Sequence, residues 1–365
     1  FCGETIVPKG LRCSQLSFNF TVRKNLKEVG IMKKILALAI CAILVISVFA
    51  GCSKESSNSV KTGLAVITSI SKSADVKDGV GAAQVDSTVV AVTVDNDGRI
   101  VKCAIDALQT KVEFNGSGEI TTPLDKVFQT KNELGTEYGM IKNSKIGKEW
   151  NEQAAAFAKY VEGKTAAEVA GIAVDDSKHP TGADLTSSVT MSIGDLIEGV
   201  QKAVKNAKDL GAKGSDKLGL GITTSISDSK NATANEDGTV SVYTHYSVTT
   251  VDSNGKITSS IIDASQTKVN FDATGKIKSD LNAAQQTKNE IGDGYNMKGS
   301  SSIKKEWYEQ AESFAKYITG KTISEVKGIS LDDSGHATNS DLKSSVTIKI
   351  GDFITVVEKA VSAAK

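Results

Sequence analysis

Alternating apolar and polar positions predict β-hairpins in two similar parts of the chain. Residues 87–94 alternate and are rich in β-branched side chains, an Asp-Asn-Asp-Gly turn signal follows, and residues 99–107 return as a second strand. The same pattern recurs at residues 240–251 and 256–264, on either side of Asp-Ser-Asn-Gly. A further strand is predicted at residues 110–114, before another Gly-containing turn. These patterns are typical of antiparallel pairing.

Helical periodicity follows the strands. Apolar residues spaced three and four apart predict helices at residues 124–134, 148–161 and 194–207, and a short helix beginning near Thr165. Because the strands are grouped ahead of the helices, the pattern predicts an α+β fold, with an antiparallel sheet packed by helices. A parallel α/β sheet would instead require strands and helices to alternate.

The chain contains an internal duplication with an offset of 157 residues. Gln-Thr-Lys-Asn-Glu at residues 129–133 recurs at 286–290, and Glu-Trp at 149–150 recurs at 306–307. Two copies are too few for a solenoid, so the sequence predicts tandem globular domains with their own cores. The predicted units are domain 1 at residues 63–208, a linker at residues 209–217 and domain 2 at residues 218–365.

The N-terminal region has the pattern of an export signal. Two lysines follow Met32, residues 35–50 are apolar, and Ala-Gly-Cys ends the run at Cys52. The apolar run has 16 residues, which is short of the roughly 20 that span a bilayer. This ending resembles the lipobox of bacterial lipoproteins, which implies a signal peptide at residues 32–51 and acyl chains on Cys52. The alternative is an ordinary secretory signal with an incidental cysteine.

Two further segments complete the N-terminal prediction. Residues 52–62 begin with a polar Ser/Lys/Asn stretch and are predicted to be a tether from the membrane surface. Residues 1–31 precede Met32, and we interpret them as an untranslated leader with Met32 as the true start. A peptide from residues 1–31 in the native protein would contradict this interpretation.

Removing the N-terminal segments changes the charge of the chain. The full sequence has 43 Lys and Arg and 43 Asp and Glu, so its net charge is zero. Residues 1–51 contain seven basic and two acidic residues, so residues 52–365 carry a net charge of −5. This balance argues against a basic surface for nucleic acid, and no nucleic-acid partner is predicted.

Past Cys52 a single cysteine, Cys103, remains, so no disulfide framework is predicted. It is interpreted as a small buried residue.

Two motifs that suggest chemistry have simpler explanations. Gly163-Lys164-Thr165 resembles the end of a phosphate-binding loop, but Ala158 stands where that loop needs a glycine. We interpret the tripeptide as the C-cap of one helix followed by the N-cap of the next. His179 and His336 follow paired aspartates in loops and are predicted to be solvent-exposed. No metal site and no hydrolase motif are predicted.

A short motif before the last helix of each copy suggests a cofactor. Asp-x-x-Ser-Ser-Val-Thr runs from Asp184 to Thr190 and again from Asp341 to Thr347. It resembles the Asp-x-x-Ser-Gly-Ala-Thr motif of the FMN-binding domain in the C subunit of sodium-pumping quinone reductase and in exported flavoproteins. In this chain Ser and Val stand at the Gly and Ala positions.

The resemblance implies a covalently bound flavin in each copy. A flavin transferase would attach FMN through a phosphoester to Thr190 and Thr347, with Asp184 and Asp341 as recognition carboxylates. The cofactor-binding set is completed by the serines of the motif, Ser187 and Ser344. Candidates for a wall beside the flavin ring recur in both copies: Tyr138, Met140, Trp150, Tyr295, Met297 and Trp307. Core or helix-face packing is the stronger explanation for each tryptophan.

The layout also resembles the flavinylated two-domain lipoproteins of Gram-positive extracellular electron transfer. It implies a carrier anchored to the lipid bilayer on the outer face of the cytoplasmic membrane. Such a carrier would relay electrons from a membrane quinone oxidoreductase to extracellular acceptors, and it would need no catalytic acid or base. The alternative is a cofactor-free surface lipoprotein that acts as a binding or adhesion module, which the low aromatic content favours.

Overall fold

The structure is a computed structural model that describes residues 59–365. The expected leader, the signal peptide, the lipidation site Cys52 and most of the tether lie outside the described residues. In the described part, residues 59–62 of the expected tether belong to the first strand instead. No helix among residues 59–365 is long and apolar enough to cross a membrane.

The first repeat builds a sheet in which every pairing is antiparallel. β3 (Val80–Val94) pairs along its length with β4 (Ile100–Phe114) on one side and with β1 (Ser59–Ser69) on the other. The short β2 (Ala74–Lys77) pairs with the start of β3, and β5 (Lys208–Lys213) pairs with β1. Because β5 is a strand, the expected linker at residues 209–217 is partly sheet.

The second repeat builds a three-stranded antiparallel sheet. β7 (Gly238–Val251) lies between β6 (Lys217–Ser225) and β8 (Ile257–Phe271). The tight turn between β7 and β8 needs a left-handed residue, and Gly255 adopts a φ of 74° there. The expected hairpins of both repeats are therefore confirmed.

Helices follow the strands in both repeats, in the same order. The first repeat contains α2 (Lys131–Leu134), α3 (Trp150–Val161), α4 (Ala166–Ala170), α5 (Ala183–Thr186), α6 (Gly194–Lys205) and two 3₁₀ turns, η1 (Gly135–Tyr138) and η2 (Met140–Lys142). The second contains α7 (Lys288–Ile291), η3 (Gly292–Tyr295), α8 (Trp307–Ile318), α9 (Ile323–Lys327), α10 (Ser340–Lys343) and α11 (Gly351–Ala363). The α+β class and the antiparallel sheets packed by helices are confirmed.

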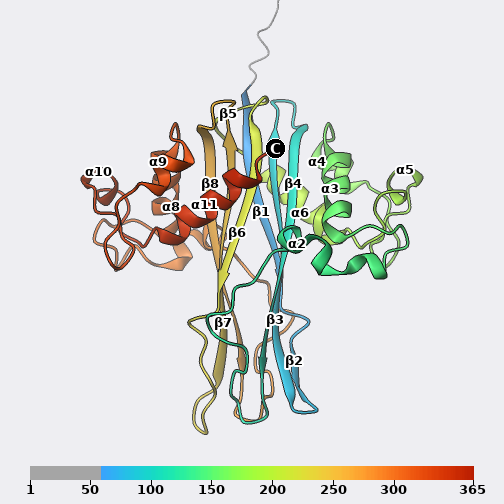
Figure 1. Ribbon diagram of the computed structural model, residues 1–365, viewed down its shortest axis with the longest axis vertical. Helices are drawn as coiled ribbons and strands as arrows, with labels where there is room; N and C mark the ends of the chain where they lie inside the picture. The colour runs from blue at the N-terminus through green and yellow to red at the C-terminus, as the bar shows by residue number, and fades with distance from the viewer. Residues whose placement is uncertain (1–58) are drawn as a thin grey trace, which may run out of the picture. The chain divides into compact units, whose positions relative to one another are not determined.

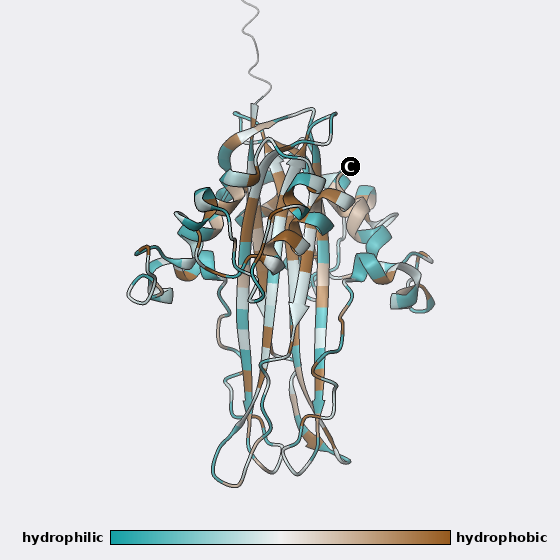
Figure 2. Cartoon of the chain, turned by 60° about the vertical axis from the view of Figure 1, so that its left-hand side comes forward, coloured by the Kyte–Doolittle hydropathy of each residue, from teal (hydrophilic) through white to brown (hydrophobic). Residues whose placement is uncertain are grey.

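The sheets of the two repeats pack against each other, and helices cover their outer faces (Figure 1). One buried cluster between the sheets joins Leu64 and Val89 to Leu220 and Tyr246. A second cluster stacks Phe114 on Phe271, with ring centroids 4.2 Å apart. Figure 2 shows hydrophobic residues spread along the long strands and hydrophilic residues on the flanking helices. The two repeats thus share part of their cores.

Two further clusters belong to single repeats. Each is formed where helices pack on the outer face of a sheet, with Trp150 and Phe157 of α3 in the first and Trp307 and Phe314 of α8 in the second. These clusters lie directly beneath the predicted site residues. Each repeat therefore has one helix-covered core cluster of its own.

Two predicted elements are wrong in extent. Within residues 124–134 only α2 is helical. Val127 in the loop before it is 82% exposed, so the apolar spacing that predicted a longer helix does not correspond to a buried helix face. Residues 100–114 form one continuous strand rather than two, because Leu108 is buried and stays in register with Ser87. The predicted helices at 148–161 and 194–207 and the short one after Thr165 are confirmed as α3, α6 and α4.

Candidate functional site

The first turn of α3 holds the loop before it through a buried carboxylate. Glu149 is 1% exposed, and its carboxylate accepts hydrogen bonds from the backbone N–H of Met140 at 2.8 Å and of Ile141 at 3.1 Å. It also caps the helix by accepting from the N–H of Glu152. The first N–H groups of a helix have no intrahelical partner. The Glu149 carboxylate thus provides an acceptor both for a first-turn N–H of α3 and for two N–H groups of the loop.

Trp150, the residue after Glu149, contacts a lysine through its indole ring. The Lys131 Nζ lies 4.9 Å from the centre of the Trp150 ring and 4.6 Å from that of Tyr138. Burial lowers the pKa of Lys131 to about 8. A cation between aromatic faces at these distances is a cation–π arrangement.

Gln153, three residues after Trp150, binds the predicted acceptor. Gln153 is fully buried, and its Oε1 accepts from the N–H of Thr190 at 2.8 Å, the N–H of Met191 at 3.1 Å and the Thr190 hydroxyl at 3.5 Å. Its Nε2 donates to Ser144 Oγ at 3.1 Å. The glutamine therefore joins the threonine loop to the loop that precedes α3.

The second repeat reproduces this arrangement. The Glu306 carboxylate accepts from the N–H of Met297 at 2.8 Å and of Lys298 at 2.9 Å. Gln310 Oε1 accepts from the N–H of Thr347 at 2.8 Å and from its hydroxyl at 3.3 Å. We call Glu-Trp-x-x-Gln, at residues 149–153 and 306–310, the anchor turn. Residues three apart share one helix face, so the tryptophan and the glutamine present a common surface.

The helix that follows each predicted acceptor begins without a side-chain cap. α6 starts after Ile193 and α11 after Ile350, and neither isoleucine forms a side-chain cap bond. By contrast, Thr165 and Thr322 form capping boxes at α4 and α9. An uncapped N-terminus offers backbone N–H groups and a positive dipole end to an anion. Asp195 and Asp352 in the first turns partly offset this preference.

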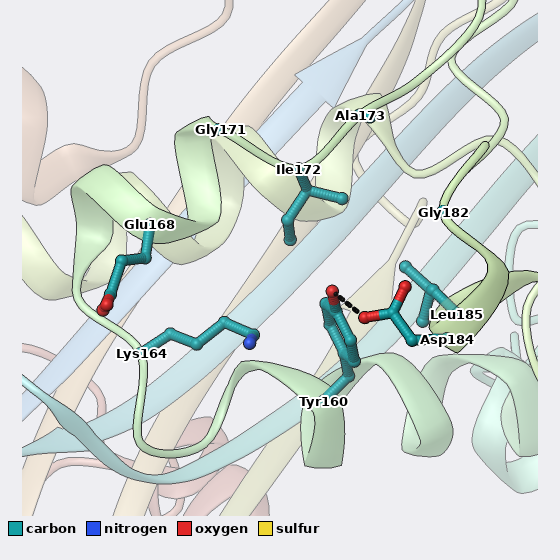
Figure 3. A pocket seen from close by; sticks show the side chains of 9 residues that line it. All are labelled: Tyr160, Lys164, Glu168, Gly171, Ile172, Ala173, Gly182, Asp184 and Leu185. Atoms are coloured by element: carbon teal, nitrogen blue, oxygen red, sulfur yellow. Dashed lines mark hydrogen bonds between the residues drawn. The ribbon is translucent and has the colours of Figure 1, made fainter.

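The predicted recognition carboxylate of the first repeat is held by a tyrosine. Asp184 Oδ2 accepts a 2.7 Å hydrogen bond from the Tyr160 hydroxyl, as Figure 3 shows, and Lys164 Nζ lies 4.4 Å from the centre of the Tyr160 ring. These residues line a cavity of about 280 Å³. Asp341 is exposed. Ser187 and Ser344 are also exposed, and the Ser344 hydroxyl donates to the Asp341 carbonyl at 2.8 Å.

The residues at the Gly and Ala positions of the motif form local structural contacts. The Ser188 hydroxyl donates back to the Leu185 carbonyl at 3.2 Å, and Ser345 repeats this contact with Leu342. Val189 is fully buried within the core cluster beneath α3. The motif therefore has a structural explanation at these two positions.

The lysine environments of the two repeats differ. Lys288 is 3% exposed, and its Nζ donates to the Tyr243 hydroxyl at 2.6 Å while facing the rings of Tyr243, Tyr295 and Trp307. In the first repeat Asp86 stands at the position of Tyr243, and Lys131 is half-buried. His245 is buried beside Tyr243 and Phe353, and burial lowers its pKa to about 4. The second site is more enclosed and more aromatic.

The two dismissed motifs have the expected local structures. Gly163 adopts a φ of 80°, and Thr165 caps α4. His179 and His336 are half-exposed, and each lies beside the aspartate four residues earlier. Within residues 59–365 no group of three or more His, Cys, Asp or Glu side chains could hold a metal ion. Cys103 is half-buried, and burial raises the pKa of its thiol.

The lysines, the glutamines and His245 are not among the residues predicted from the sequence. The lysines and glutamines are repeated without change at the 157-residue offset, and a fully buried glutamine repeated in this way signals a fixed partner. No comparable signal marks His245, because Thr88 stands at its position in the first repeat.

A buried carboxylate beside Lys288 predicts a pH dependence of stability. Asp263 Oδ1 accepts from the N–H of Ala264 and of Asn289, and burial raises its pKa to about 7. The folded protein therefore prefers the protonated Asp263 carboxyl. Its contribution to the free energy of unfolding is fully present below about pH 4 and is lost as the pH rises through 7. Asp263→Asn should remove this loss. Relative to wild type, the variant should gain on the order of 3 kcal/mol of unfolding free energy between pH 4 and pH 7.5.

Urea unfolding of both proteins across this pH range measures the difference. Asp333→Asn, at an exposed position, is the matched control and should change stability equally at both pH values. A constant difference between Asp263→Asn and wild type would contradict the assignment.

Comparisons with known proteins give one short match. No family model matches the chain, and no solved structure matches it. A chlorophenol reductase from Desulfitobacterium hafniense is 49% identical over 41 residues, which is 11% of this chain and 12% of that protein. The matched stretch is much shorter than one repeat.

Proposed function

We propose that each repeat is a domain that carries FMN in phosphoester linkage, on Thr190 in the first and on Thr347 in the second. The protein would then be a membrane-anchored, extracytoplasmic electron carrier. It would relay electrons from a membrane quinone oxidoreductase to extracellular acceptors, after a flavin transferase has loaded both sites. One observation carries the proposal: a fully buried glutamine holds the acceptor threonine in the same way in both repeats.

The acceptor hydroxyl is held loosely while its backbone is held firmly. Thr190 and Thr347 are half-buried, and their hydroxyls reach the glutamine oxygen only at 3.5 and 3.3 Å, whereas their N–H groups reach it at 2.8 Å. Hydrogen bonds weaken at such lengths. Replacing the hydroxyl proton by a phosphoester therefore costs little, and the glutamine keeps the loop in place.

The surroundings supply what a flavin phosphate and ring need. The uncapped starts of α6 and α11 offer backbone N–H groups to a phosphate. The anchor-turn tryptophans are buried in the core, so an apolar face for the ring would come from the half-buried Tyr138 or Tyr295, each with a lysine against its ring. When bound, FMN supplies the one- and two-electron chemistry, and the protein supplies attachment, orientation and electrostatics.

Mass spectrometry tests this proposal directly. The chain is co-expressed with a flavin transferase, and intact mass and in-gel flavin fluorescence are recorded. We expect wild type to gain two units of FMN less water, and Thr190→Ala and Thr347→Ala to gain one unit each. Thr186→Ala, at the end of α5 four residues before Thr190, is the control and should gain two. If no variant gains mass, the alternative of a cofactor-free binding or adhesion lipoprotein replaces the redox proposal.

The anchor-turn glutamine should control loading at its own site. Gln153→Ala frees the Thr190 loop, and misplacing a reacting group slows the reaction, so loading of Thr190 should slow on the order of tenfold or more. Loading of Thr347 in the same molecule is the internal control and should keep its rate. The time course of peptide-resolved mass gain measures both. Equal slowing at both threonines would point to a general loss of structure instead.

A further inference from the structure

The two copies of the acceptor motif differ in what holds their aspartate. In the first repeat Asp184 Oδ2 accepts a 2.7 Å hydrogen bond from the Tyr160 hydroxyl, which joins α5 to α3 (Figure 3). In the described part of the second repeat, the Asp341 carboxylate accepts only from the Ser340 hydroxyl, at 3.5 Å. Tyr317 stands at the position of Tyr160, but among residues 59–365 its hydroxyl has no hydrogen-bond partner.

The setting of the tyrosine does not explain this difference. Each tyrosine lies near the end of its helix, with a lysine against its ring. Lys164 Nζ lies 4.4 Å from the centre of the Tyr160 ring, and Lys321 Nζ lies 4.7 Å from that of Tyr317. Because both tyrosines have the same neighbour at nearly the same distance, the cause must lie in the segment that carries the aspartate.

A glycine in that segment makes room for the Asp184 carboxylate. Gly182 precedes α5 with φ −69° and ψ 131°, and Asn339 precedes α10 with φ −72° and ψ 145°. A Cβ at Gly182 would lie 2.7 Å from Asp184 Oδ1. Since the backbone is the same, the Cβ of Asn339 fills this space in the second repeat and keeps the Asp341 carboxylate out of it. Asn339 also caps α10 by accepting from the N–H of Leu342 at 2.8 Å.

The hydrogen bond makes the two carboxylates unequal toward a partner that needs them. Asp184 and Asp341 are both exposed, so burial does not distinguish them. A hydrogen bond to an ionised carboxylate is stronger than one between neutral groups. A partner that binds Asp184 must first replace the Tyr160 hydroxyl, whereas Asp341 needs no such exchange.

We propose that the Tyr160 hydroxyl withholds Asp184 from the flavin transferase, so that Thr347 is loaded before Thr190. The inference rests on the proposed function, in which the transferase loads both threonines and recognises the aspartate of each motif. In each loading step the threonine oxygen bonds to the FMN phosphorus of a flavin adenine dinucleotide. The pyrophosphate bond breaks, AMP leaves and the hydroxyl proton is released to water. The glycine of the first repeat thus sets the order of loading.

Carboxyl labelling tests the first step without a transferase. The full chain is treated with a carbodiimide and glycine ethyl ester, and tandem mass spectrometry follows labelling of each aspartate. We expect Asp341 to react at least about threefold faster than Asp184, because the hydrogen bond must open first. Tyr160→Phe removes only the hydroxyl, and Gly182→Asn installs the residue of the second repeat. Both should bring Asp184 to within about twofold of Asp341.

A loading time course tests the consequence. The full chain, purified without a transferase, is incubated with the transferase and FAD, and peptide-resolved mass gain is recorded. We expect Thr347 to load at least about threefold faster than Thr190. Tyr160→Phe and Gly182→Asn should each remove this difference and leave the rate at Thr347 unchanged. Tyr317→Phe is the matched control and should change neither rate.

The outcomes separate this inference from the proposed function. Circular dichroism establishes that each variant is folded. Equal loading rates at the two threonines of wild type would overturn the inference and leave the proposed function standing. Slower loading of Thr190 that persists in both Tyr160→Phe and Gly182→Asn would also overturn it, because the cause would lie elsewhere. Equal labelling of Asp184 and Asp341 in wild type would overturn the first step. Absence of loading at both threonines would overturn the proposed function, and the inference with it.

Discussion

Gly219→Ala is expected to destabilise the protein by about 3 kcal/mol or more. A Cβ at Gly219 would lie 1.8 Å from the carbonyl oxygen of Ala360, and one at Gly221 would lie 2.2 Å from that of Val356. These contacts are with helix backbone, so no side chain can move aside. α11 packs directly on β6 because these two residues have no side chain, and an added methyl must separate the helix from the sheet.

The control for this prediction lies on the same helix. Gly351 begins α11, and a Cβ there meets nothing within 4 Å, so Gly351→Ala should stay within about 0.5 kcal/mol of wild type. Urea unfolding followed by circular dichroism measures both variants. A loss below about 1 kcal/mol in Gly219→Ala would contradict the close packing of α11 on β6.

Glu306→Ala should destabilise the protein by about 3–5 kcal/mol. The carboxylate is 1% exposed and accepts hydrogen bonds from the N–H of Met297, Lys298 and Glu309. Alanine leaves these three partly buried donors without their acceptor, and a buried donor that loses its partner costs roughly 1–3 kcal/mol. The loop that carries Tyr295 toward Lys288 should loosen at the same time.

A conservative variant separates hydrogen bonding from packing at this position. Glu306→Gln keeps one acceptor oxygen and the side-chain volume, so its loss should be about half that of Glu306→Ala. Hydrogen exchange should show faster exchange of the Met297 and Lys298 amides in the alanine variant. Equal stability of wild type and Glu306→Ala would mean that the carboxylate does not hold this loop.

The hairpins and amphipathic helices could be predicted because each has one buried face. Residues 87–94 with their Asp-Asn-Asp-Gly turn and the helix at residues 148–161 follow the expected periods, and the structure has both elements. β1 and β6 were missed because both of their faces are covered, by the opposing sheet on one side and by α6 or α11 on the other. Leu64, Ala65 and Val66 are buried in succession, so no alternation remains to be read.

The candidate site could be predicted only where it is local in sequence. The motif from Asp184 to Thr190 is contiguous and could be read directly, but Gln153 lies 37 residues before the threonine it binds. That contact depends on the packing of α3, which periodicity predicts only as a helix with one buried face. Asp184 is predicted from the motif as a recognition carboxylate, but its hydrogen bond to Tyr160, seven residues after Gln153 on the same helix, could not be read from the sequence.

The electron-carrier proposal depends on a covalent bond at two specific hydroxyls, and peptide mapping locates that bond. Protein co-expressed with a flavin transferase is digested, and tandem mass spectrometry assigns each flavin to a residue. We predict two modified peptides, with the mass of FMN less water on Thr190 in one and on Thr347 in the other. Flavin on any other residue, or both threonines recovered unmodified beside an active transferase, would contradict the proposal.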